Sequence, residues 1–229
     1  MTQPDLIRTT FLAYLTTQNV PHSVQGAMVC VHDSLWIKPG ANVALPEAMV
    51  IEGSLDIHDT EYTCLPERLS VRDDLLLDHT AITALPAVLC VGRDILAAHS
   101  ALATLPENLH VFRDLDIKAS QITHLPEGLV VEGDLNFRKT QVARLPTHML
   151  VRGDIEPSGS LLDIIAYMDT QAGDVVVSLG TSHHARMSAM HDLKDFPDLR
   201  TVMESLRLGV DLRLIKGRHS KVFPELFWR

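Results

Sequence analysis

Five aspartates recur at intervals of twenty residues, and this row of carboxylates is the first feature of the chain that could do chemistry. The residues are Asp74, Asp94, Asp114, Asp134 and Asp154. If twenty-residue units stack about 5 Å apart, the five charges repel one another unless donors or cations compensate them. We favour hydrogen bonding to backbone N–H groups at turns. Calcium is the alternative, because hard cations accept stacked carboxylates, but the Gly-Gly-x-Gly-x-Asp pattern of calcium-binding coils is missing.

Three histidines in the C-terminal third, His183, His184 and His191, invite a zinc interpretation. His184 and His191 are seven residues apart and could share a helix face. No cysteine or closely spaced fourth ligand joins them, so we interpret them as solvated histidines. Asp192 and Asp195 lie near His191 and resemble a catalytic acid–base pair, but such groupings are common on ordinary helices. We therefore expect no catalytic residue, no metal and no cofactor.

A column of hydroxyl side chains has the same period as the aspartates. It consists of Thr60, Thr80, Ser100, Ser120 and Thr140. A hydroxyl both donates and accepts, so stacked hydroxyls can satisfy backbone groups where the chain turns off a strand. We predict a structural ladder and no catalytic use.

A Leu-Pro pair that recurs every twenty residues indicates the framework that positions these columns. The leucines are Leu45, Leu65, Leu85, Leu105, Leu125 and Leu145. Within a unit, apolar residues follow at intervals of two, as at Val131, Leu135 and Phe137 with Gly133 between them. This spacing is typical of a β-strand, and the proline opposes a helix. Because one unit cannot bury its apolar columns alone, the period predicts stacked units with parallel strands.

The ends of the repeat suggest how the chain is divided. Residues 25–44 look like a decayed first unit in which Pro39-Gly40 replaces the hydroxyl, and Leu6, Phe11, Leu12 and Leu15 have helical spacing. We expect a helical cap at residues 1–24, a solenoid of about six to seven units at residues 25–156, and a small α/β cap or domain at residues 157–229. The predicted fold class is a repeat solenoid with a parallel β array resembling leucine-rich repeats.

The segment after the repeat reads as mixed elements behind a linker at residues 156–159. We expect a helix starting at Ser160, a strand at 174–179, helices at 183–196 and 198–206, and a strand at 210–215. The turn at residues 179–182 is a weak anion-site signal, and a plain turn is favoured. The apolar segment 222–228 is expected to pack back on the protein, with a partner-docking tail as the alternative.

The unit L-P-x-x-L-x-V-x-G-D-L-x-I-x-x-T-x-I-x-x resembles the short, bacterial, Leu-Pro class of leucine-rich repeat. The resemblance covers roughly residues 25–156, and it implies a protein-binding array of the kind found in secreted effectors of Gram-negative bacteria. Thr or Ser stands where that family usually has asparagine, and the Gly-Asp step is not typical. Some members carry a C-terminal ubiquitin ligase with a nucleophilic cysteine after the repeats. The cysteines here are Cys30, Cys64 and Cys90, so ligase activity is not implied.

In such repeats, the residues that flank the inward Leu and Ile of the strand point to the concave face, so the resemblance implies a partner-binding surface. The side chains expected there are Asp56, His58, Leu76, Asp78, Leu96, Ala98, Asp116, Lys118, Asn136 and Arg138. The face would be acidic at its start, apolar in the middle and basic at its end. Adjacent exposed leucines often mark a contact, although the C-terminal segment or a neighbouring copy could cover them.

Composition restricts the choice of partner. The chain has 229 residues, is 46% hydrophobic and has a net charge of −9. The repeat from Leu45 to Ile155 holds 17 acidic against 9 basic residues, which argues against nucleic acid as its ligand. No apolar run is long enough to span a bilayer, and the N-terminus lacks a signal-peptide layout. The three cysteines are expected to be free, buried thiols of a reducing compartment, so we expect a cytoplasmic protein or one exported without a cleavable signal.

These observations favour a non-catalytic scaffold that binds a protein partner, possibly as a secreted effector. The alternative is an enzyme or toxin-like effector whose C-terminal segment is catalytic and whose repeats select the substrate. The identity of the partner and the oligomeric state are left open.

Overall fold

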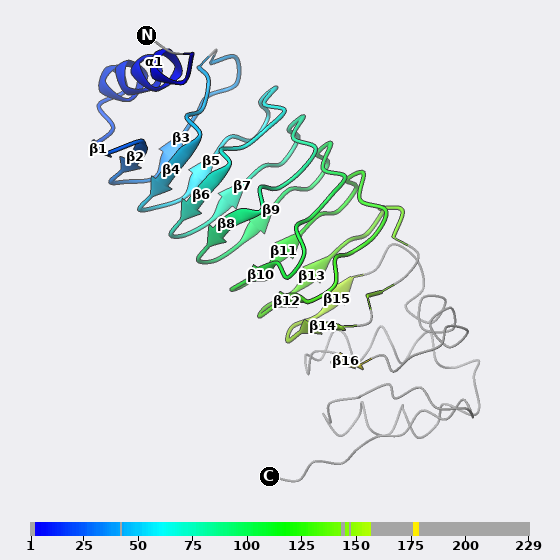
Figure 1. The fold of residues 1–229 in the computed structure, drawn as a ribbon. Helices are drawn as coiled ribbons and strands as arrows, with labels where there is room; N and C mark the ends of the chain where they lie inside the picture. Colours follow the sequence, from blue (N-terminus) through cyan, green and yellow to red (C-terminus); the bar gives the residue numbers. More distant parts are fainter. Residues whose placement is uncertain (1–2, 42, 143–144, 147, 157–175, 179–229) are drawn as a thin grey trace, which may run out of the picture.

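In a computed structural model, the chain forms a parallel β-solenoid of about six turns with one helix at its N-terminal end (Figure 1). The structure describes residues 3–156, except 42, 143, 144 and 147, together with residues 176–178. The predicted repeat solenoid is confirmed, and so is the absence of helix from the described part of the array.

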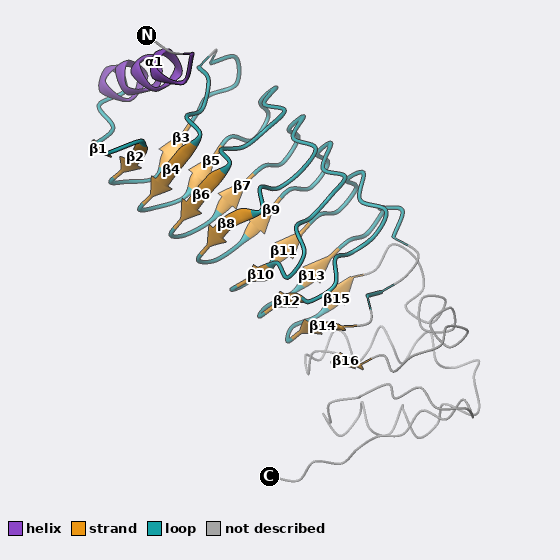
Figure 2. Cartoon of the chain, in the orientation of Figure 1, coloured by secondary structure: helices purple, strands orange, loops and turns teal. Residues whose placement is uncertain are grey.

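Each turn contributes one strand to each of two sides of the coil, and loops close the remaining side (Figure 2). The first side consists of β1 (His22–Gln25), β2 (Met28–Val31), β4 (Ala48–Ile51), β6 (Arg68–Val71), β8 (Val88–Val91), β10 (His110–Val111), β12 (Leu129–Val131) and β14 (His148–Val151). The second side consists of β3 (Leu35–Trp36), β5 (Leu55–Asp56), β7 (Leu75–Leu76), β9 (Ile95–Leu96), β11 (Leu115–Asp116), β13 (Leu135–Asn136) and β15 (Ile155–Glu156). Neighbouring strands on the second side pair in parallel at an offset of twenty residues, which makes the sequence period a physical repeat.

The core is built from the inward side chains of both strands. In one turn, Leu69 and Val71 of β6 and Leu75 and Leu77 at β7 are all buried. The next apolar column, represented by Ile82, is buried under the loop that carries Leu-Pro. These columns form one continuous hydrophobic cluster along the array, as the period predicts.

The run of alternating apolar residues is not one strand, as its spacing suggested, but two strands that meet at a bend. Residues 132 and 133 form the bend between β12 and β13. A Cβ added to Gly133 would lie 2.1 Å from Oδ1 of Asp114 and 2.8 Å from the carbonyl of Arg113. Gly133 thus lies close against the preceding turn, but Asp73, Arg93 and Arg113 occupy the equivalent bend in other turns, so the bend does not require glycine.

The N-terminal end is closed by α1 (Gln3–Thr17) and by β1. Phe11 and Leu15 of α1 are buried in the first turn of the core, as the helical spacing predicted, whereas Leu6 is exposed. The inward residues of the decayed first unit are also buried; they are Val29, Val31, Leu35 and Ile37. β1 was not predicted as a strand, and it pairs antiparallel with β2 at the edge of the first side. An antiparallel neighbour ends the parallel stack and occupies the backbone groups of that edge.

The first side is interrupted between β8 and β10, which divides its strands between two sheets. The amides of Gly92 and Glu132 each donate to the preceding turn, but no such bond joins Phe112 to β8. The interruption coincides with Asn108, whose φ of 56° is left-handed. Asparagine tolerates this conformation, whereas the equivalent Val88 lies in a strand. The turn containing Asn108 therefore takes a different path, and β10 is shortened to two residues.

Within the C-terminal segment, the structure describes β16 (Val176–Ser178), which lies inside the strand predicted at 174–179. β16 pairs in parallel with β14, with Met149 opposite Val177. The first side of the coil thus continues past the end of the Leu-Pro period. The helices and the second strand predicted after Ser160 lie outside the described residues.

Candidate functional site

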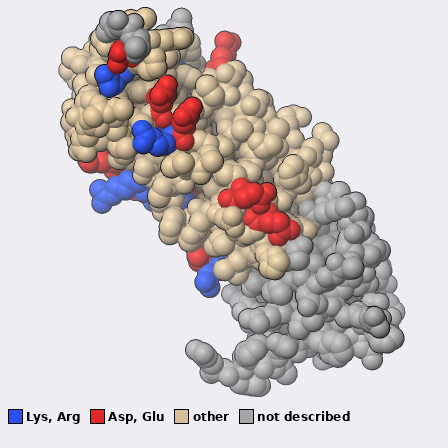
Figure 3. Space-filling model, in the orientation of Figure 1, with Lys and Arg blue, Asp and Glu red and all other residues tan. Residues whose placement is uncertain are grey.

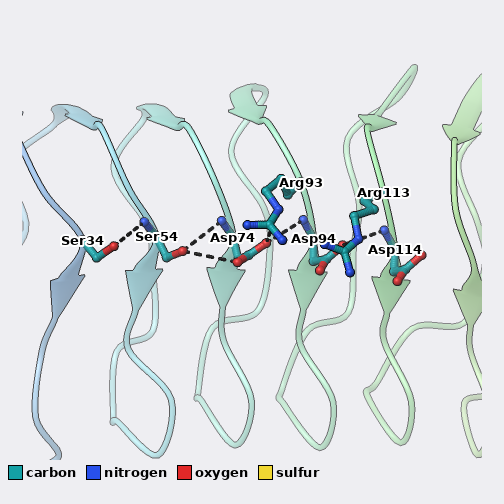
Figure 4. A network of polar contacts seen from close by, with 7 residues as sticks. All are labelled: Ser34, Ser54, Asp74, Arg93, Asp94, Arg113 and Asp114. Atoms are coloured by element: carbon teal, nitrogen blue, oxygen red, sulfur yellow. Dashed lines mark hydrogen bonds and ion pairs between the residues drawn. The ribbon is translucent and has the colours of Figure 1, made fainter.

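The aspartate column forms a hydrogen-bonded ladder along the corner between the two sides of the coil (Figure 4). Oδ1 of each of the first four aspartates accepts the backbone N–H of the residue twenty positions later. The distances are 3.3 Å from Asp74 to Asp94, 3.0 Å from Asp94 to Asp114, 2.8 Å from Asp114 to Asp134 and 2.7 Å from Asp134 to Asp154. Ser34 and Ser54 extend the ladder with hydroxyl acceptors. The prediction of backbone donors is confirmed, with the donor in the next turn of the coil.

Arginine side chains compensate part of the negative charge of this ladder. Nε of Arg93 lies 3.6 Å from Oδ1 of Asp74, and Nε of Arg113 lies 3.4 Å from Oδ1 of Asp94. Within the described residues, no group of three or more His, Cys, Asp or Glu side chains is placed to hold a metal ion. Backbone hydrogen bonds and these ion pairs compensate the carboxylates of the column.

The hydroxyl column forms a second ladder where each turn leaves the second side. The hydroxyls of Thr60, Thr80, Ser100 and Thr140 donate to the carbonyl three residues earlier, at distances of 2.5–2.7 Å. Ser120 is the exception, because its buried hydroxyl has no partner. The residue before each hydroxyl is left-handed, with φ between 54° and 59°. The predicted structural role is confirmed for four of the five hydroxyls.

The ten residues expected on the binding face lie in two adjacent columns on the outer face of the second side. The first column consists of residues that pair in register from strand to strand; they are Asp56, Leu76, Leu96, Asp116 and Asn136. The second column lies two residues later, in the turn that follows each two-residue strand, and the residue between the two columns is buried in every one of these turns. We call this surface the seven-stranded face.

The acidic start of the seven-stranded face contains a carboxylate–imidazole pair. Nδ1 of His58 lies 2.5 Å from Oδ1 of Asp56, and the same oxygen accepts the backbone N–H of His58 at 3.1 Å. Hydrogen bonding to Asp56 and the charge of that carboxylate raise the pKa of His58, against a smaller opposing effect of burial. Nε2 of His58 also lies 3.8 Å from Asp59. The pair can exchange a proton, and within the described part of the chain its hydrogen bonds and ion pairs involve no nucleophilic hydroxyl or thiol.

The centre of the face combines two half-buried leucines with one carboxylate. Leu76 and Leu96 are adjacent in register, and Asp78 lies beside Leu76 in the second column. Oδ1 of Asp78 accepts the backbone N–H of Ala98 at 2.6 Å. Burial raises the pKa of Asp78, and this hydrogen bond opposes the rise. The predicted apolar centre is therefore present, with an acidic group at its border.

The far end of the face is held by side-chain to backbone contacts. Oδ1 of Asp116 accepts the N–H of Lys118 at 2.9 Å, and Oδ1 of Asn136 accepts the N–H of Arg138 at 3.1 Å. Arg138 also pairs with Glu156 at 3.6 Å. Because the polar side chains of the first column bind their own strands, their positions are restrained before any partner arrives.

Sequence reasoning missed the first row of this face. Trp36 pairs in register with Asp56 and is 52% exposed, and Nζ of Lys38 lies 5.5 Å from the centre of its ring. Counting back twenty residues from Asp56 would have found Trp36. The row was overlooked because residues 25–44 lack the Leu-Pro pair and were treated as a capping unit.

The cysteines correct one prediction. Cys30 is buried as expected, but Cys64 and Cys90 are exposed, and all three are free. Cys90 lies between the inward Leu89 and Val91, so alternation along β8 turns its thiol outward. Cys30 and Cys90 occupy the same column three strands apart, as the period predicts.

The remaining chemical candidates lie outside the described residues. They are the histidines His183, His184 and His191, the carboxylates Asp192 and Asp195, the turn at 179–182 and the apolar segment 222–228. Among the residues that the structure does describe, no helix is long and apolar enough to cross a membrane.

Comparison with known proteins identifies no relative. No family model, curated protein or solved structure matches this chain. The functional argument therefore rests on the geometry of the seven-stranded face.

Proposed function

We propose that this chain is a non-catalytic scaffold that binds a protein partner through the seven-stranded face. The observation that carries the proposal is the alignment of Leu76 and Leu96 at the centre of two ordered columns. A partly exposed apolar centre bordered by charged side chains has the composition of a protein contact, in which the centre supplies desolvation and the rim supplies orientation. The resemblance to Leu-Pro repeats of secreted effectors supports the same class of function.

Three properties of the face favour a protein over a small molecule. Its apolar centre is made of side chains in neighbouring strands of an extended sheet and not of a closed pocket of polar groups. Its polar side chains Asp56, Asp116 and Asn136 already bind backbone N–H groups of their own strands. Trp36 adds an exposed aromatic ring at one end, and aromatic residues are enriched at protein contacts.

The test is capture of partners by the immobilised chain, comparing wild type with the double variant Leu76→Asp and Leu96→Asp. We expect the double variant to lose the specific partner, because two carboxylates in the centre of the contact remain desolvated and unpaired. Mass spectrometry of the retained proteins identifies the difference.

Val88→Asp is the matched control, because Val88 is an equally apolar residue, 60% exposed, on the first side of the coil. It should retain the partner. Unchanged capture by the double variant, with circular dichroism and thermal unfolding like wild type, would move the binding site away from the seven-stranded face.

A further inference from the structure

Charge on the seven-stranded face is arranged differently from charge on the chain as a whole. The chain has a net charge of −9, and in Figure 3 several of the visible basic side chains lie next to acidic ones on a mostly uncharged surface. The face holds three basic side chains, Lys38, Lys118 and Arg138, against four acidic ones, Asp56, Asp78, Asp116 and Glu156. Its net charge is therefore close to zero, which removes most of the repulsion that two copies of an acidic protein would otherwise experience here.

In two rows of the face, an acidic side chain in one column stands beside a basic side chain in the other. Asp56 and Asp116 stand in the first column, and His58 and Lys118 stand beside them in the second. If a second copy is rotated by 180° about an axis parallel to the solenoid, its second column faces the first column of its partner at the same height. Each row then meets the same row of the other copy.

This arrangement places complementary groups opposite each other in four rows, two of which pair an acidic with a basic side chain. Asp56 faces His58 of the other copy, Asp116 faces Lys118, Trp36 faces Lys38, and Leu96 faces Ala98. Trp36 with Lys38 repeats across the contact the cation–aromatic pair found within one copy. Leu76 opposite the half-buried Asp78 is the one mismatched row.

The reversed arrangement, with the two solenoids running in opposite directions, is less favourable. When the reversed arrangement is centred on the leucines, Leu76 of one copy meets Leu96 of the other. Asp56 of one copy then meets Asp116 of the other, and Lys38 meets Arg138 in the same way. Like charges directly opposite one another oppose association. Charge complementarity therefore selects matched rows.

On this basis we propose that the partner of the seven-stranded face is a second copy of this chain, packed face to face with matched rows. The inference rests on the proposed binding role of that face. Sheets packed face to face lie about 10 Å apart, and seven strands at about 4.8 Å spacing provide a contact about 29 Å long. The contact is only two columns wide, so the dimer is expected to be weak, and its association has to be sought at high protein concentration.

The test is sedimentation equilibrium of the full chain from about 1 to 300 μM. Wild type should approach twice the 25.4 kDa monomer mass within this range. Lys118→Asp places acids in both columns of its row, and Asp116→Lys places bases in both columns of the same row. Each variant alone should need at least fivefold more protein to dimerise, because like charges then face each other across the contact.

An equimolar mixture of the two variants should recover association, because the acids of one variant then face the bases of the other.

Arg72→Asp is the control for charge reversal, because Arg72 is exposed at the bend after β6 and outside the two columns of the seven-stranded face, and it should dimerise like wild type. Wild type that stays monomeric throughout overturns the second-copy proposal, and so does a mixture that fails to recover association. The proposed function is tested separately. If the chain is monomeric but captures a different protein, and Leu76→Asp with Leu96→Asp abolishes that capture, the scaffold role is retained and the dimer is rejected.

Discussion

At the scale of single residues, the aspartate ladder shows how a repeated carboxylate can be a structural group. Each of these carboxylates accepts an N–H from the following turn, so the side chain joins consecutive units. A half-buried donor that loses its acceptor costs more free energy than one hydrogen bond contributes on balance.

Asp94 provides a direct test of that role, because its side chain is only 14% exposed. Asp94→Ala should lower the free energy of unfolding by about 1–3 kcal/mol, since the N–H of Asp114 loses its acceptor. Asp94→Asn keeps an acceptor oxygen and should change it by less than about 1 kcal/mol. Urea denaturation measures both, and equal losses in the two variants would contradict the ladder.

The Asp56–His58 pair predicts a pH dependence of stability. The pKa of His58 is raised above its ordinary value of 6.5, so the folded state holds the proton more tightly than the unfolded state. The stabilisation is full below pH 6.5 and is lost as pH rises through the folded-state pKa. Asp56→Asn retains an acceptor for the N–H of His58 but removes the charge, so its stability deficit should be larger at pH 6 than at pH 9. Urea denaturation at both pH values measures it, and a deficit independent of pH would exclude the ion pair as the cause.

At the scale of elements, the corners decide how strands are placed. Each turn bends between its two strands and again at a left-handed residue before the hydroxyl column, where side chains other than glycine are strained. The left-handed Asn108 marks the turn at which the ladder of the first side is interrupted.

Ala119 provides a test at one corner, because its φ is 54°. Ala119→Gly should raise the free energy of unfolding by about 0.5–1 kcal/mol, since relief of backbone strain exceeds the added entropy of the unfolded chain. Ala101→Gly, at a residue without positive φ, should lower it by a similar amount. Thermal and urea unfolding show whether each variant raises or lowers the free energy of unfolding. A loss of stability in both variants would show that the corner carries no strain.

At the scale of the whole molecule, the solenoid is a stack in which each turn contacts chiefly its neighbours, so its stability grows with the number of turns. Deletion of residues 61–80 removes one whole unit, so that Ala81 follows Thr60 in the position that Glu61 held. The shortened chain should fold and unfold cooperatively, with a smaller denaturant dependence because less surface is exposed on unfolding. Deletion of residues 61–70 places apolar columns against polar ones and should abolish cooperative unfolding. Circular dichroism during urea titration measures both, and similar behaviour of the two deletions would contradict a stack with a twenty-residue period.

Which residues are equivalent, and which of them face the core, follows from the sequence, because a fixed period and an alternation of two define columns without knowledge of the path of the chain. On that basis Leu75 and Leu77 face inward and Leu76 faces outward, and the burial agrees. Three features appear once the chain is folded: the apolar run bends at Gly133 into two strands, Asp94 binds a donor in the next turn, and Trp36 extends the seven-stranded face. These features depend on close approach between neighbouring turns, and the spacing of residue types along one turn contains no information about the backbone groups of the next.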